Sequence, residues 1–257
     1  MICRSKTRIG LIRPIAKTTI LLSVVFFFVF FCGEASAQRK FSRNYPAGQN
    51  IRLELTNRTG TVTVIGWDRS LINISADIEE PAAVISPQNL SGVIVINLLR
   101  DNPEREIGNV NFTIRLPYNS AIDIETRLGN LNVSNIRSAL VRAHISSEGD
   151  ITLTNIISNA VLAENGLGDI FFDGEIQEGG SYRFSSMRGN INIRIPFNSP
   201  FKFVATAPST RNITVGFCAN PNMGSVGDGR RIIGRCGDGT ATMNVINQRG
   251  NIKFLPR

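Results

Sequence analysis

Four copies of one short phrase decide how this sequence is interpreted: GNLNV from Gly129, GDITL from Gly149, GDIFF from Gly168 and GNINI from Gly189. The four glycines are 20, 19 and 21 residues apart. A near-constant period of this length is typical of folds built from stacked repeats. The sequence therefore predicts an all-β fold in which each repeat packs on the next.

The phrase recurs on both sides, as GTVTV from Gly60, GNVNF from Gly108, RNITV from Arg211 and GNIKF from Gly250. In all eight copies the second and fourth residues after the corner are aliphatic or Phe, and the residue between them is mostly polar. This alternation is that of a strand with one buried face. The predicted inward columns are Val62, Val110, Leu131, Ile151, Ile170, Ile191, Ile213 and Ile252, and Val64, Phe112, Val133, Leu153, Phe172, Ile193, Val215 and Phe254.

The glycine that opens each phrase predicts a sharp corner, because glycine adopts positive φ without a steric penalty. The predicted repeat corners are Gly60, Gly108, Gly129, Gly149, Gly168, Gly189 and Gly250. Asn or Asp usually follows, and these side chains stabilise turns by local hydrogen bonds. A calcium-binding column is the alternative, although mixed amides and carboxylates favour a turn role.

A second apolar segment precedes most corners, so each repeat predicts two or three short strands. These segments are Ile122–Thr126, Leu140–Ser146, Ala160–Glu164, Ser181–Ser185 and Thr242–Asn247. No such strand can bury its apolar face alone, which favours a single-domain β-solenoid over residues 51–257. The alternative is an antiparallel meander folded into a sandwich. Residues 81–107 interrupt the period and predict an irregular hairpin around Val93–Leu99.

The N-terminal segment predicts export. Basic residues between Arg4 and Lys17 precede an apolar run that ends at Cys32, and Ala35-Ser36-Ala37 follows. This is the pattern of a secretory signal peptide over residues 1–37, cleaved between Ala37 and Gln38, with a polar lead over residues 38–50. An uncleaved anchor and lipoprotein processing at Cys32 are alternatives. The expected location is the periplasm, the outer envelope surface or the extracellular space, without a transmembrane segment after cleavage.

The net charge argues against a nucleic-acid partner. The full chain carries +8, of which the leader supplies five basic residues and one Glu, so the mature chain keeps +4. It contains no run of Lys or Arg and no RNA-type aromatic motif. We therefore expect no nucleic-acid binding.

Cys218 and Cys236 are the only cysteines left after cleavage. In an exported chain two remaining cysteines most simply form a disulfide. We expect this bond to join an antiparallel hairpin near the C-terminus, between Ile213–Phe217 and Arg231–Arg235. Residues 240–254 are expected to close the end of the stack.

Two residues invite a functional interpretation. Trp67, the only tryptophan, predicts either a cap over the open end of the stack or an aromatic platform for a sugar. His144, the only histidine, lies on an outward position of a predicted strand and lacks partners for metal binding or proton transfer. We find no candidate catalytic, cofactor-binding or metal-binding residues, and the sequence predicts no cofactor.

The GWD segment at Gly66, the phrases RLPYNS at Arg115 and RIPFNS at Arg194, the G-[DN]-[IL] corners and the terminal GDGTATMNVINQRGNIKF resemble the bacterial putative adhesin family. The resemblance covers residues 51–254. It implies an exported β-solenoid domain without a known activity or defined functional residues. Arg211 in a corner and the cysteine pair depart from the family pattern.

Two classes of function follow. The first is a non-enzymatic binding or structural protein of the cell envelope or surface, with a polysaccharide or an envelope protein as partner. The alternative is a polysaccharide-acting β-helix enzyme, a lyase or hydrolase, which needs facing carboxylates such as Asp123, Asp169 and Asp173, or converging Arg142 and Arg183.

Overall fold

The computed structural model describes residues 39–48, 51–218, 222–237 and 239–257. Residues 38–257 form one compact unit. The predicted signal peptide, its cleavage site between Ala37 and Gln38, and Cys32 lie outside the described residues. Within the described part, no helix has the length and hydropathy needed to cross a membrane.

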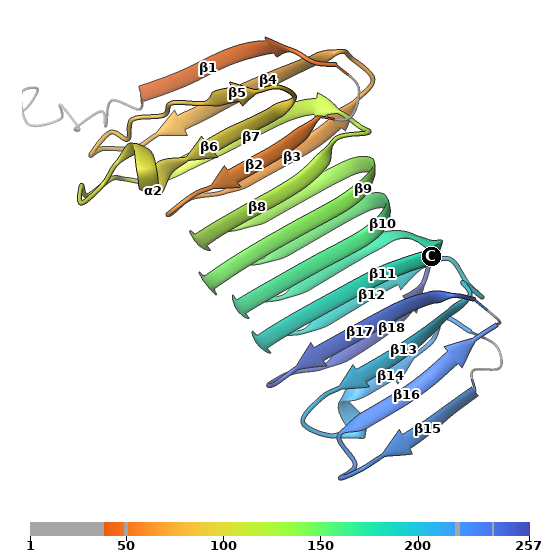
Figure 1. Cartoon of the computed structure of the whole chain (residues 1–257). Coiled ribbons are helices and arrows are strands. Elements are labelled where there is room, and N and C mark those ends of the chain that lie inside the picture. The colour runs from red at the N-terminus through yellow and green to blue at the C-terminus, as the bar shows by residue number, and fades with distance from the viewer. Residues whose placement is uncertain (1–38, 49–50, 219–221, 238) are drawn as a thin grey trace, which may run out of the picture. The chain divides into compact units, whose positions relative to one another are not determined.

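The regular structure of the described residues is almost entirely β, and the strands are joined in one mixed sheet (Figure 1). In chain order the elements are β1 (Arg39–Pro46), β2 (Arg52–Thr56), β3 (Val62–Trp67), β4 (Leu71–Ile78), β5 (Gln88–Leu90), β6 (Val93–Asn97), α2 (Leu98–Asp101), β7 (Val110–Pro117), β8 (Ala121–Leu128), β9 (Leu131–Glu148), β10 (Ile151–Leu167), β11 (Ile170–Arg188), β12 (Ile191–Ile195), β13 (Phe201–Thr206), the 3₁₀ helix η1 (Thr210–Asn212), β14 (Ile213–Val215), β15 (Asn222–Val226), β16 (Arg231–Cys236), β17 (Ala241–Asn247) and β18 (Ile252–Pro256).

The middle of the chain pairs in parallel with the register that the sequence period predicts. Leu131 of β9 lies opposite Ile151 of β10, which lies opposite Ile170 of β11. The first halves of these long strands pair further with β3 on one side and β12 on the other. The second halves pair further with β8 on one side and β17 on the other. We call these two runs the first and second ladder. Antiparallel pairs occur towards both ends, as in β1–β4 and β15–β16, so the sheet is mixed.

The core lies along the two predicted inward columns. Fifteen of the sixteen residues are buried, and Val215 is half-buried. The second ladder adds buried aromatic side chains, with Tyr182 and Phe184 packing near Phe172. Burial of alternate residues on parallel strands explains why each strand carries apolar side chains at every second position.

The order of the strands departs from chain order at both ends, which corrects two expectations. In the first ladder the order is β7–β3–β9–β10–β11–β12–β18–β14. Val62 lies opposite Phe112, so the Gly108 phrase is displaced by two residues and Gly108 does not stack in the column of corner glycines. Residues 240–254 do not close the stack, because β17 and β18 lie inside it.

The other corner glycines lie directly above one another. Gly129, Gly149, Gly168, Gly189 and Gly250 all have φ between 109° and 148°, where other residues are strained. A Cβ atom on any of these five would overlap the carbonyl oxygen of the corner glycine in the neighbouring repeat. Glycine is therefore required both for the turn and for the close approach of successive strands.

The Asn and Asp residues after the corners form a ladder of hydrogen bonds. Each side-chain oxygen accepts from the backbone N–H of the equivalent residue in the next repeat: Asn130 from Asp150 at 2.9 Å, Asp150 from Asp169 at 2.8 Å, and Asp169 from Asn190 at 2.7 Å. Only an acceptor oxygen is needed, so Asn and Asp serve equally. This accounts for the mixed column, and the described residues contain no cluster of three metal-ligating side chains.

The end regions contain two features that bear on the sequence predictions. The polar lead includes β1, which pairs antiparallel with β4 and which the sequence pattern did not predict. The Cys218–Cys236 disulfide is present. The hairpin expected between Ile213–Phe217 and Arg231–Arg235 does not form, because β14 pairs with β18. The C-terminal hairpin is formed by β15 and β16. The disulfide joins the segment after β14 to the end of β16.

Candidate functional site

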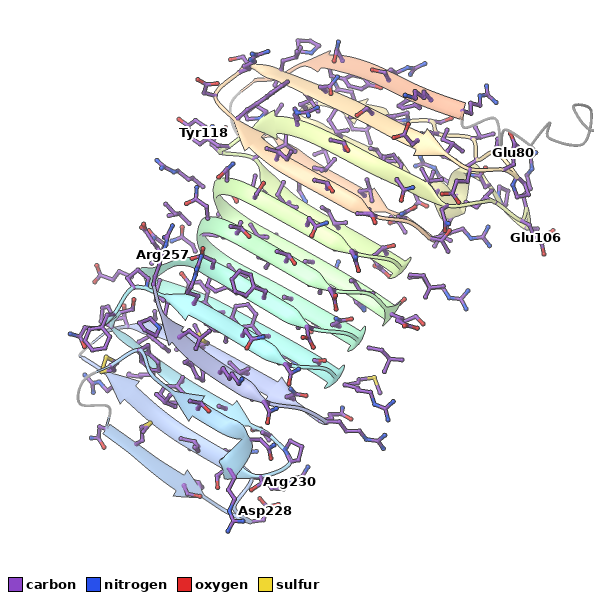
Figure 2. The ribbon with its side chains drawn as sticks, turned by 180° about the vertical axis from the view of Figure 1, so that it is seen from behind. Glu80, Glu106, Tyr118, Asp228, Arg230 and Arg257 are labelled. Atoms are coloured by element: carbon purple, nitrogen blue, oxygen red, sulfur yellow. A yellow bond between two sulfur atoms is a disulfide. The ribbon has the colours of Figure 1, made fainter. Side chains whose placement is uncertain are left out.

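Two adjoining depressions lie beside Trp67, at the corner where β3 ends. Their volumes are about 410 and 330 Å³, and both are lined by Trp67, Asp68 and Tyr118. Volumes of this size suit a small ligand. Figure 2 shows Tyr118 at the end of the strands opposite to that of Glu80 and Glu106.

Backbone and side-chain contacts fix the indole of Trp67. Its Nε1–H donates to the carbonyl of Leu71 at 2.8 Å, and its own carbonyl accepts from the N–H of Tyr118 at 2.9 Å. The preceding residue is Gly66, where a Cβ atom would overlap the carbonyl oxygen of Asn135. The GWD segment thus combines a close strand contact with a fixed aromatic ring. Trp67 does not cap the stack, because β3 lies between β7 and β9.

Tyr118 forms the second aromatic wall. It follows β7 directly, its backbone carbonyl accepts from the N–H of Arg137 at 2.7 Å, and 45% of the residue is exposed. The same phrase recurs at Pro196-Phe197-Asn198-Ser199, where Phe197 is 52% exposed. The two copies therefore place an aromatic residue at equivalent turns, but among the described residues only Tyr118 lies beside a tryptophan.

Polar side chains surround the two rings. The guanidinium of Arg69 lies 5.2 Å from the centre of the Trp67 ring, a cation–π contact. Asn135 and Asn155 both have left-handed backbone angles, with φ of 58° and 54°, and the amide of Asn155 donates to Oδ1 of Asn135 at 2.8 Å. The remaining polar lining residues are Asp68, Ser70, Asn119 and Arg137. Together the two depressions offer aromatic rings, a carboxylate, guanidinium groups and amides.

The carboxylates on which the enzyme alternative depends are engaged in structural contacts. Asp123 accepts from Arg52 at 3.0 Å and from Arg142 at 2.7 Å, and the hydrogen bond to Asp123 raises the pKa of Arg142. Asp173 is buried and accepts from the guanidinium of Arg194. Asp169 belongs to the hydrogen-bond ladder at the corners.

Arg183 and His144 lie on the outer face of the second ladder. Arg183 forms an ion pair with Glu164 at 3.6 Å, whereas Arg142 forms one with Asp123 at 2.7 Å. His144 is half-buried and lies between Glu125 and Glu164 in the register. Sequence reasoning missed these neighbours because they come from adjacent repeats.

Comparison with known proteins identifies the fold. No family model and no curated protein matches the chain. A putative cell adhesion protein from Clostridium sporogenes matches with a TM-score of 0.52 at 14% identity, over 86% of this chain and all of that one. A putative adhesin from Bacteroides fragilis matches with a TM-score of 0.38 at 10% identity, over 86% of this chain and 99% of that one. The chain therefore shares the fold of the Clostridium sporogenes protein, and this match confirms the adhesin resemblance of the sequence at the level of the fold.

Proposed function

We propose that this chain is an exported, non-enzymatic binding protein of the cell envelope or surface, and that it holds a saccharide in the depression beside Trp67. The observation that carries the proposal is the pairing of Trp67 and Tyr118 in a depression bordered by Asp68, Arg69 and Asn119. Aromatic rings pack against the apolar faces of a ligand, and charged and amide groups bond its hydroxyls.

The open ring of the pair is Tyr118. Arg69 lies over the indole of Trp67, so that ring is partly occupied, whereas Tyr118 is 45% exposed. A sugar ring stacked on Tyr118 would place its hydroxyls near Asn119 and Asp68, which line the same depression. In this arrangement Trp67 forms the wall and Tyr118 the platform.

The architecture supports a binding role without catalysis. The parallel register of β9, β10 and β11, with corners 19 to 21 residues apart, favours a β-solenoid, which presents fixed side chains on a repeating frame. The disulfide and the leader pattern favour an oxidising compartment outside the cytoplasm. The adhesion name of the Clostridium sporogenes protein agrees with a surface role.

The test is affinity electrophoresis of oxidised residues 38–257 through gels that contain defined polysaccharides, followed by titration with fragments of any that retard the protein. Tyr118→Ala is expected to weaken binding about tenfold, and Phe197→Ala is the matched control because Phe197 occupies the equivalent turn and is similarly exposed. Absence of retardation by every polysaccharide, or equal weakening by both substitutions, would contradict the proposal.

A further inference from the structure

A groove of about 480 Å³ lies on the outer surface of β11, β17, β13 and β16, which are hydrogen-bonded side by side (Figure 1). None of the described residues that line it borders the depression beside Trp67. Its lining includes Arg183, Lys202, Val204, Ile233, Thr242 and Asn244.

The strand register sets the order of the groups across this groove. Arg183 lies opposite Asn244, which lies opposite Val204, which in turn lies opposite Ile233. This row is polar at β11 and apolar at β16. The groove is also lined by Tyr182, Phe203 and Met243, whose side chains are buried, so these three contribute their main chain to its floor.

The charge of the groove is positive. The charged side chains that line it are Arg183 and Lys202, and no Asp or Glu is among its lining residues. Among the described residues Lys202 forms no ion pair. Asp228 lies in the turn between β15 and β16, at the end of these strands (Figure 2). An anion is the complementary ligand.

The apolar end of the groove is open. Ile233 is 42% exposed, Val204 is half-buried, and Val226 on the neighbouring edge strand β15 is 45% exposed. A ligand with a negative group at Lys202 and a hydrocarbon chain over Val204 and Ile233 would match both the charge and the apolar surface of the groove. Arg183, although paired with Glu164, has 52% of its side chain exposed and lies at the polar end of the row.

We infer that this groove binds a free single-chain anionic amphiphile, with its carboxylate at Lys202 and its acyl chain over Val204 and Ile233. The inference does not depend on saccharide binding beside Trp67. It requires both parts of the ligand, because Lys202 supplies the charge and Ile233 supplies the apolar surface. Each additional methylene group in contact with the groove is expected to tighten binding by up to about fourfold.

The test is isothermal titration of oxidised residues 38–257 with dodecanoate below its micellar concentration. Three comparison probes separate the contributions: dodecyl maltoside has the chain without the charge, acetate has the charge without the chain, and phosphatidylglycerol vesicles present the same chemistry as a bilayer. Dodecanoate is expected to bind at least tenfold more tightly than dodecyl maltoside, and acetate is expected not to bind measurably.

Two exposed substitutions locate the site. Lys202→Glu and Ile233→Ser are each expected to weaken dodecanoate binding at least tenfold, and Lys253→Glu, an exposed lysine on β18 in the first ladder, is expected to leave it unchanged. Equal affinity for dodecyl maltoside, binding to vesicles without binding to free dodecanoate, or no response to Lys202→Glu and Ile233→Ser would overturn the inference.

Discussion

The substitution Gly168→Ala tests whether the stacked corners hold the repeats together. Gly168 has a φ of 132°, and an added Cβ atom would overlap the carbonyl oxygen of Gly149 and lie 2.8 Å from Oδ1 of Asp150. The substitution therefore imposes two separate costs, one from the backbone angle and one from the neighbouring strand.

The expected loss of stability is the sum of these two costs. A non-glycine residue in a sparsely populated backbone region costs roughly 1–3 kcal/mol. Forcing an extra methyl group into a closely packed contact costs roughly another 1–3 kcal/mol. Gly168→Ala should thus lower the free energy of unfolding by about 4 kcal/mol, a large part of the roughly 5–15 kcal/mol typical of folded proteins.

Two other glycines separate the costs. Gly227 has a φ of 78° and no atom within 4 Å of the position that an added methyl group would take, so Gly227→Ala should cost only about 1–2 kcal/mol. Gly224 has neither a positive φ nor a close neighbour, and Gly224→Ala should change stability by less than about 0.5 kcal/mol. The measurement is urea unfolding of the oxidised protein, followed by circular dichroism. The dependence of the free energy of unfolding on urea concentration, the slope m, is expected to be the same for all variants. If Gly168→Ala costs no more than Gly227→Ala, the close stacking of corners does not constrain the fold.

Two further predictions concern the disulfide and a buried tyrosine. Replacing Cys218 and Cys236 together by Ser should lower the free energy of unfolding by about 3 kcal/mol, because the bond closes a loop with a sequence separation of 18; identical urea midpoints for oxidised wild type and the double variant would contradict this. The hydroxyl of Tyr182 donates to the carbonyl of Ser158 at 2.8 Å and accepts from the N–H of Gln177 at 2.7 Å, and burial raises its pKa above the ordinary value of about 10. Because the unfolded chain then loses this proton at a lower pH than the folded chain, the stability advantage of wild type over Tyr182→Phe should be constant below about pH 9 and shrink as the pH rises past about 10. Urea unfolding of both proteins between about pH 7 and pH 11 measures this difference, and a difference that does not change with pH would contradict the assignment.

The repeating middle of the fold could be predicted from the sequence because each repeat meets the same local requirements. Gly149 and Gly168 both need a positive φ and the same kind of close contact, and Leu131, Ile151 and Ile170 occupy the same buried position. Such requirements repeat at a fixed spacing, so they are visible without knowledge of distant contacts.

The order of the strands at the ends could not be predicted in this way. β3 lies between β7 and β9 in the sheet, although both of these strands come after it in the chain. Every strand in this ladder presents equivalent backbone edges, so local sequence does not decide which strand lies beside which. The pairing of β2 with both β6 and β8 is equally long-range.

The candidate site was only half visible in the sequence. Trp67 is conspicuous as the only tryptophan, but Tyr118 and Asn155 come from other repeats and meet it only after stacking. The RLPYNS and RIPFNS phrases signalled turns, and the aromatic residue that follows proline in both was the available clue. A recurrent exposed aromatic residue at a turn can indicate a contact surface as well as a structural repeat.

The position of β18 has a consequence for the order of folding. This strand lies between β12 and β14, both of which precede it in the chain, so Ile252 completes contacts with Ile191 and Ile213 at the same time. Until residues 252–256 join the sheet, β12 and β14 each lack the neighbour that they have in the folded chain. Completion of this end of the sheet must therefore wait for the last strand of the chain, however early the central repeats assemble.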